Sequence, residues 1–180
     1  MLKKKLFLLF IVAAFAACSA DKKGGQSLNS TVFIEQKLNG YLAENADWVV
    51  EESESEATDK FKRQAIKWSN EPDFLKDMPL QLIAIKDTVV SEQAVKLIVF
   101  KSFKDASRPE NYLLNDIGLQ INGIFSADQI KDLGVDKKYT LKGMLFKQGK
   151  RADVNVSVSA EKPFYNIGTY TFWNLETKAL

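Results

Sequence analysis

The chain has 180 residues, contains no histidine and has one cysteine, Cys18. The lack of histidine excludes Ser-His-Asp and Cys-His catalysis, and it excludes zinc and haem sites that need a histidine ligand. The formal net charge is +2, but residues 1–17 hold three lysines and no acid, so the remaining 163 residues have a net charge of −1. That balance gives no overall electrostatic basis for binding nucleic acid.

Residues 1–17 have the pattern of a secretory signal peptide. Three lysines precede an apolar run from Leu6 to Ala17, which is shorter than the ~20 residues that a transmembrane helix needs. The run leads directly into Cys18, and the sequence Ala16-Ala17-Cys18 resembles the lipobox of bacterial lipoprotein precursors. The resemblance implies that a diacylglycerol is attached to Cys18, that the chain is cleaved before it, and that the new amine is acylated, as with palmitate.

Residues 18–30 are polar and include two adjacent glycines, which predicts a flexible tether. About a dozen such residues span roughly 20 Å, enough to hold a domain away from lipid headgroups. The resemblance implies a lipid anchor on the periplasmic side or at the outer membrane of a diderm bacterium. Ser19, in place of aspartate after the cysteine, resembles an enterobacterial outer-membrane sorting signal. Residues 31–180 are expected to form one α+β domain, with a helical layer at 31–78 and a β-rich part at 79–180.

Two helices are predicted in the helical layer from an apolar period near 3.6. The first has Ser30 or Thr31 as its cap, and the second begins with a capping box of Ser53 and Glu56. The acidic start of the second helix is better explained as a solvated helix entry than as a calcium site or an acidic docking face, because its acids lack a calcium-loop spacing. The apolar positions are Ile34, Leu38, Tyr41, Leu42, Trp48 and Val49 in the first helix, and Phe61, Ala65 and Trp68 in the second.

From Pro79 onward the apolar residues alternate with a period of two, which predicts strands. A short helix, with Ser126 and Gln129 as a capping box and Gly134 as its end, interrupts them. The two strands after this helix are expected to pair across a turn at residues 148–150. The predicted strands are 80–86, 95–103, 116–125, 138–146, 152–160 and 168–175.

Three strands, a helix and two strands is the element order of the OB-fold, a small Greek-key barrel. Over residues 79–160 the chain resembles this order, and Gly123 and Gly143 would suit the bends that close a barrel. The competing arrangement is an open antiparallel sheet packed on the two helices. Both are N-terminal helices followed by an antiparallel β-domain, so both are α+β folds.

Five aromatic residues lie between positions 164 and 173. Aromatic side chains can stack on sugar rings or bases, or they can fill a core. Alternation places Tyr170 and Phe172 on one face, which we assign to the core, and Trp173 on the other. The candidate binding residues are therefore Trp173, Tyr165 and Phe164.

A basic group surrounds the predicted hairpin, but export and the mature net charge favour solvated strand edges over a nucleic-acid surface. Acids such as Asp116 and Glu110 could in principle act on glycosidic bonds, although no spacing singles them out. We assign no catalytic residue, metal site or cofactor. The basic group consists of Lys137, Lys138, Lys142, Lys147, Lys150 and Arg151.

Together these features predict a membrane-anchored bacterial lipoprotein with a non-catalytic binding or scaffolding role in the cell envelope. Its partners would be envelope proteins or glycans and the membrane that holds its anchor. The alternative is a small carboxylate-dependent hydrolase that acts on envelope glycans. Such an enzyme needs a cleft with two carboxyl groups about 5 to 10 Å apart, one of them with a raised pKa.

Overall fold

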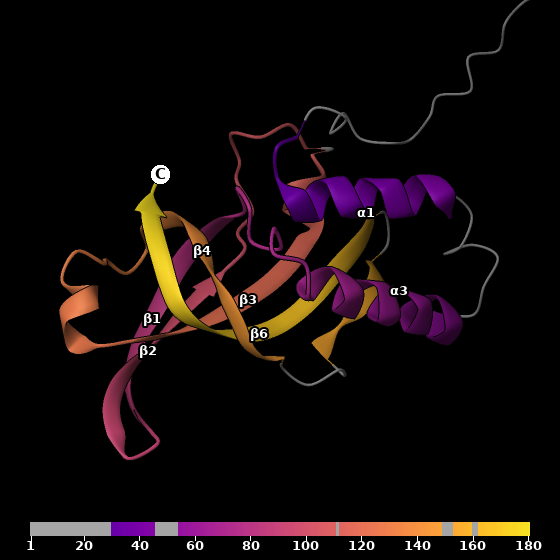
Figure 1. Cartoon of the computed structure of the whole chain (residues 1–180). Coiled ribbons are helices and arrows are strands. Elements are labelled where there is room, and N and C mark those ends of the chain that lie inside the picture. Colours follow the sequence, from indigo (N-terminus) through magenta and orange to yellow (C-terminus); the bar gives the residue numbers. More distant parts are fainter. Residues whose placement is uncertain (1–29, 46–53, 111, 149–152, 160–161) are drawn as a thin grey trace, which may run out of the picture.

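The computed structural model describes residues 30–45, 54–110, 112–148, 153–159 and 162–180 (Figure 1). The expected signal peptide, the lipidation site Cys18 and the tether up to residue 29 lie outside the described residues. The helix positions Trp48, Val49 and Ser53 also lie outside them.

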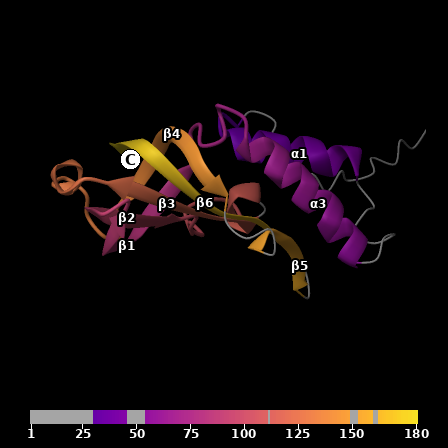
Figure 2. The same ribbon diagram turned by 60° about the horizontal axis from the view of Figure 1, so that its bottom comes forward.

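In the described residues, two helices precede the strands, as the sequence predicts. They are α1 (Phe33–Glu44) and α3 (Glu54–Ser69), and they lie side by side at one end of the molecule (Figures 1 and 2). The predicted cap of α1 is displaced, because the residue before the helix is Val32, whose N–H donates to the Ser30 hydroxyl at 3.1 Å. The predicted apolar sides are confirmed by five buried residues: Ile34, Leu38, Phe61, Ala65 and Trp68.

Six strands follow, with a short 3₁₀ helix (Ala127–Ile130) between the third and the fourth. The predicted capping box of Ser126 and Gln129 is present at that helix. The first two strands form a longer hairpin than expected, because Ser91 and Glu92 both have positive φ, the conformation of a tight two-residue turn. The strands are β1 (Pro79–Val90), β2 (Gln93–Lys101), β3 (Ile117–Phe125), β4 (Lys138–Gln148), β5 (Asn155–Ser159) and β6 (Lys162–Ala179).

The sheet closes into a partial ring. Its strand order is β3-β2-β1-β4-β6-β5, and β3 also pairs with β6. All the pairings are antiparallel except that between β3 and β6. The ladder between β1 and β4 covers only Pro79–Gln81 and Lys138–Thr140. These two strands are therefore hydrogen-bonded to each other over a short part of their length. The fold is α+β, and its sheet is neither flat nor continuously paired around the ring.

The predicted hairpin between the fourth and fifth strands is wrong. In the described residues β4 pairs with β6 and β1, and β5 pairs with β6 alone. β6 has 18 residues and pairs with both strands, and it has positive φ values at Gly168 and Asn174, of 109° and 51°. The C-terminal strand therefore takes the place that the sequence assigned to β5.

The hydrophobic core lies between the helices and the inner face of the curved sheet. The turn at residues 71–78 contributes Phe74, whose ring meets Tyr170 edge-on at a centroid distance of 5.0 Å. From α3, Phe61 contacts Tyr165 of β6 at 5.9 Å between centroids. These contacts show which face of β6 lies against the core. The opposite face of β6, and of β3 beside it, points away from the core.

Candidate functional site

The outer face of β3 and β6 carries a row of uncharged polar side chains. The parallel pairing places Gln120 opposite Thr169 and Asn122 opposite Thr171. Asn166 continues the row along β6, and all five side chains are partly exposed. Because successive side chains of a strand point to opposite faces, the buried residues between them face the core. Those buried residues are Leu119, Ile121, Ile167, Tyr170 and Phe172.

An aromatic side chain stands at each end of this row. The Phe164 ring lies over Gly118, where a Cβ atom would come within 2.8 Å of two ring atoms, and the side chain is 41% exposed. At the other end, Trp173 lies in register with Ile124 of β3 and with Met144 of β4, which is 69% exposed. We call this surface the outer strip, defined as Phe164, Asn166, Thr169, Thr171 and Trp173 of β6 and Gln120 and Asn122 of β3.

Hydrogen bonds within the outer strip orient its amide groups. Gln120 Nε2 donates to Asn122 Oδ1 at 3.1 Å, which leaves the two donors of the Asn122 Nδ2 group outside this bond. Asn166 Oδ1 accepts from the Gly168 N–H at 3.1 Å and so holds the bend in β6. Within the described residues, the Asn122 Nδ2 group and the hydroxyls of Thr169 and Thr171 have no hydrogen-bond partner in the protein. These groups are available to solvent or to a ligand.

The structure separates the three candidate binding residues. Phe164 and Trp173 belong to the outer strip, but Tyr165 is only 4% exposed and packs against Phe61 in the core. Burial, and then the charge of Asp116, raises the pKa of the Tyr165 hydroxyl. Tyr165 is therefore a core residue and not a contact residue. Strand alternation could have separated it from its neighbour Phe164, because adjacent residues face opposite sides.

Tyr170 and Phe172 are buried, and their assignment to the core is confirmed. The Tyr170 hydroxyl donates to the backbone carbonyl of Ile167 at 2.9 Å. Burial raises the pKa of Tyr170 to about 12, so the hydroxyl stays protonated at neutral pH. This bond fixes the ring beneath the bend in β6 and so supports the outer strip from inside.

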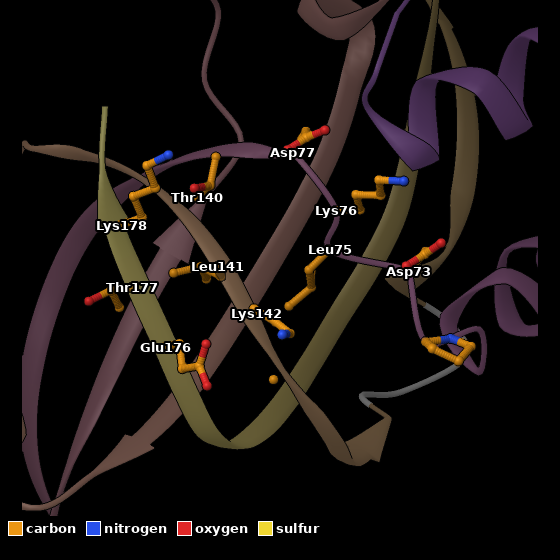
Figure 3. A pocket seen from close by; sticks show the side chains of 12 residues that line it. Asp73, Leu75, Lys76, Asp77, Thr140, Leu141, Lys142, Glu176, Thr177 and Lys178 are labelled. Atoms are coloured by element: carbon orange, nitrogen blue, oxygen red, sulfur yellow. The ribbon is translucent and has the colours of Figure 1, made fainter.

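A pocket of about 460 Å³ lies elsewhere, between the turn at residues 72–77 and strands β4 and β6 (Figure 3). Its charged lining residues are mixed in sign. The acids are Asp73, Asp77 and Glu176, and the bases are Lys76, Lys142 and Lys178. Because the lining has as many acids as bases, its charge favours neither an anionic nor a cationic ligand.

The carboxyl groups with a raised pKa do not line this pocket. Burial raises the pKa of Glu35 and of Asp116, and in Asp116 the charges of Lys162 and Lys104 oppose the shift. The backbone carbonyl of Glu110 accepts a hydrogen bond from Lys162 Nζ at 2.8 Å. None of these acids is a lining residue of the pocket. No observation here favours the hydrolase, which stays a prediction from the sequence.

The basic group is partly engaged in local contacts. Lys138 Nζ pairs with Asp105 at 3.1 Å and lies 4.5 Å from the centre of the Phe103 ring. Lys142 lines the pocket, whereas Lys150 and Arg151 lie outside the described residues. The Asp105 pair ties the loop after β2 to the start of β4, which is a structural role.

The described part of the chain contains no group of three or more acids, cysteines or histidines that could hold a metal ion. None of the helices in the described ranges is long and apolar enough to span a membrane. No protein-family model matches the chain, and no curated protein or solved structure matches it significantly.

Proposed function

We propose that this chain is a lipid-anchored bacterial lipoprotein whose folded domain is a non-catalytic binding or scaffolding module of the cell envelope. The proposed anchor rests on the sequence Ala16-Ala17-Cys18 after an apolar run. Two or three acyl chains anchor a protein stably, with about 0.8 kcal/mol for each buried methylene group. The domain then needs no membrane-binding face of its own, and its surface is available for a partner.

The outer strip is the observation that supports a binding role. It joins two aromatic side chains through a row of amides and hydroxyls on a sheet face that no described helix covers. The β3–β6 pairing holds the backbone of these residues, and Asn166 fixes the bend at Gly168, so little backbone entropy would be lost when a ligand binds. A rigid, uncharged and partly exposed surface of this kind suits recognition better than acid–base chemistry, which needs convergent titratable groups.

Site-specific photocross-linking in the native envelope tests the proposal. A benzoylphenylalanine in place of Thr171 should form discrete adducts in intact cells, because it lies in the outer strip. The same group in place of Thr88, on the β1–β2 hairpin, is the control and should form none. Equal adducts at both positions, or none at Thr171, would contradict a binding role for the outer strip.

A further inference from the structure

We infer that the outer strip binds a neutral glycan chain that lies along β3 and β6 between Phe164 and Trp173. This inference rests on the proposed binding function and names the chemistry of its ligand. Three features of the outer strip support the glycan: its lack of charge, its hydrogen-bonding groups and its length.

The outer strip contains no charged side chain. Nucleic acids and acidic polysaccharides are bound mainly through lysine and arginine, which neutralise their negative groups. On the neighbouring strand β2, Lys101 lies opposite Gln120, but Val99 lies opposite Asn122 and Leu97 lies opposite Ile124. On the other side of the strip, Lys147 of β4 lies in register with Thr171. One lysine position thus flanks the strip on each margin, and the strip between them is uncharged, which does not match the closely spaced charges of a polyanion. A neutral ligand fits this surface.

The polar groups of the strip match hydroxyl groups. An amide side chain offers two donors and an acceptor, and a threonine hydroxyl both donates and accepts. Sugar hydroxyls also do both, so they can bond to the Asn122 Nδ2 group and to the hydroxyls of Thr169 and Thr171. These groups are partly exposed and hydrated in the free protein, so exchanging water for a sugar hydroxyl leaves no buried group unpaired.

The aromatic side chains at the two ends of the strip suit the apolar faces of sugar rings. Pyranose rings have apolar C–H faces, which can pack on the ring of Phe164 or Trp173. An apolar protein partner would instead leave the amides and hydroxyls between the two rings without bonds, at a cost of about 1 to 3 kcal/mol for each group that is buried.

The length of the strip fits a short oligosaccharide. Gly118, under Phe164, and Ile124, beside Trp173, are the two ends of the strip on β3. At about 3.3 Å per residue, these positions are roughly 20 Å apart. A single monosaccharide would reach only one of the aromatic rings, whereas an extended chain can contact both rings and the polar row between them.

Titration calorimetry of the full chain in detergent tests the inference. The probes are dextran, laminarin, galactomannan and chitohexaose as neutral glycans, and heparin as a polyanion. We expect at least one neutral glycan to bind with a Kd below about 1 mM. The double variant Asn122→Ala/Thr171→Ala should weaken that binding at least tenfold. Thr88→Ala/Gln93→Ala, which removes the same kinds of group from the β1–β2 hairpin, should change it less than twofold.

Three results would overturn the inference: no binding of any neutral glycan, stronger binding of heparin, or equal affinities of the two double variants. Cross-linking from Thr171 separates this failure from that of the proposed function. A discrete protein adduct without glycan binding would reject the glycan and keep the binding role. The absence of both would reject both, and circular dichroism of each variant would verify that it is folded.

Discussion

The hydroxyl of Ser30 donates a 2.6 Å hydrogen bond to Oε2 of Glu35, a carboxyl group that is fully buried in the first turn of α1. Burial raises the pKa of Glu35, and the Ser30 bond, the backbone of Leu114 and the charge of Arg108 partly oppose the shift. Leu114 lies in a second short 3₁₀ helix (Leu113–Asp116) just before β3, so Glu35 lies where the helical layer meets the sheet. The charge of ionised Glu35 would therefore be buried at the contact between the two layers.

Replacing Glu35 with glutamine should change the pH dependence of stability. The folded-state pKa lies above the ordinary value of 4.5, so the folded protein binds more protons than the unfolded chain between the two values. The free energy of unfolding should therefore decline as the pH rises from 4.5 through the raised pKa. Glu35→Gln, which stays neutral and can still accept from Ser30, should remove this decline and be more stable than the wild type near pH 7.

Urea unfolding between pH 4 and 8 measures this effect. Glu92→Gln, at the exposed turn of the β1–β2 hairpin, is the matched control and should keep the wild-type profile. A Glu35→Gln profile parallel to that of the wild type would show that Glu35 does not carry the pH dependence.

Phe74 should be far more important for stability than Phe164. The Phe74 ring is buried between the turn at residues 71–78 and β6, against Tyr170 and Phe172. Phe74→Ala should cost about 3 to 5 kcal/mol because it removes a large core side chain. Phe164→Ala, at the outer strip, should cost less than about 1 kcal/mol, as for most surface changes. Denaturant midpoints compare the two variants, and equal losses would contradict the placement of Phe164 outside the core.

The local parts of this fold could be predicted from the sequence, because each depends on residues a few positions apart. The apolar side of α3, the alternation of β3 and the capping box at Ser126 and Gln129 all follow from spacing alone. The displaced start of α1 has a local cause too. Ser30 bonds to Glu35 and to the N–H of Val32, and Val32 occupies the position directly before the helix.

The long-range pairings could not be predicted in this way. The turn predicted at 148–150 favoured a hairpin between the fourth and fifth strands, but β6 pairs with β4 and also runs parallel to β3. The outer strip depends on this parallel pairing. Alternation alone puts Gln120 and Asn122 on a solvent face, and nothing in the spacing shows that Thr169 and Thr171 lie beside them.

Two glycine-to-alanine changes should shift stability in opposite directions. A Cβ atom at Gly123 of β3 would lie 2.4 Å from the Phe125 ring and 2.5 Å from Leu175, inside the core. Gly123→Ala should therefore cost about 1 to 3 kcal/mol through overpacking. In α1, a Cβ at Gly40 meets nothing within 4 Å, so Gly40→Ala should stabilise the protein by about 0.5 to 1 kcal/mol. Thermal unfolding measures both, and a stabilising Gly123→Ala would contradict the close packing of β3 on β6.

Cys18→Ala tests the proposed anchor directly. If Cys18 carries the diacylglycerol, the intact mass of the variant should lack the acyl increment, and the protein should leave the membrane fraction. Nearly all of the protein should be lost from the membrane fraction, because the anchor's affinity comes from the buried methylene groups, at about 0.8 kcal/mol each. Ser19→Ala, which keeps the cysteine, should remain acylated and membrane-bound. An unchanged mass and location for Cys18→Ala would reject Cys18 as the site of a lipid anchor, and the surface available to a partner would have to be reconsidered.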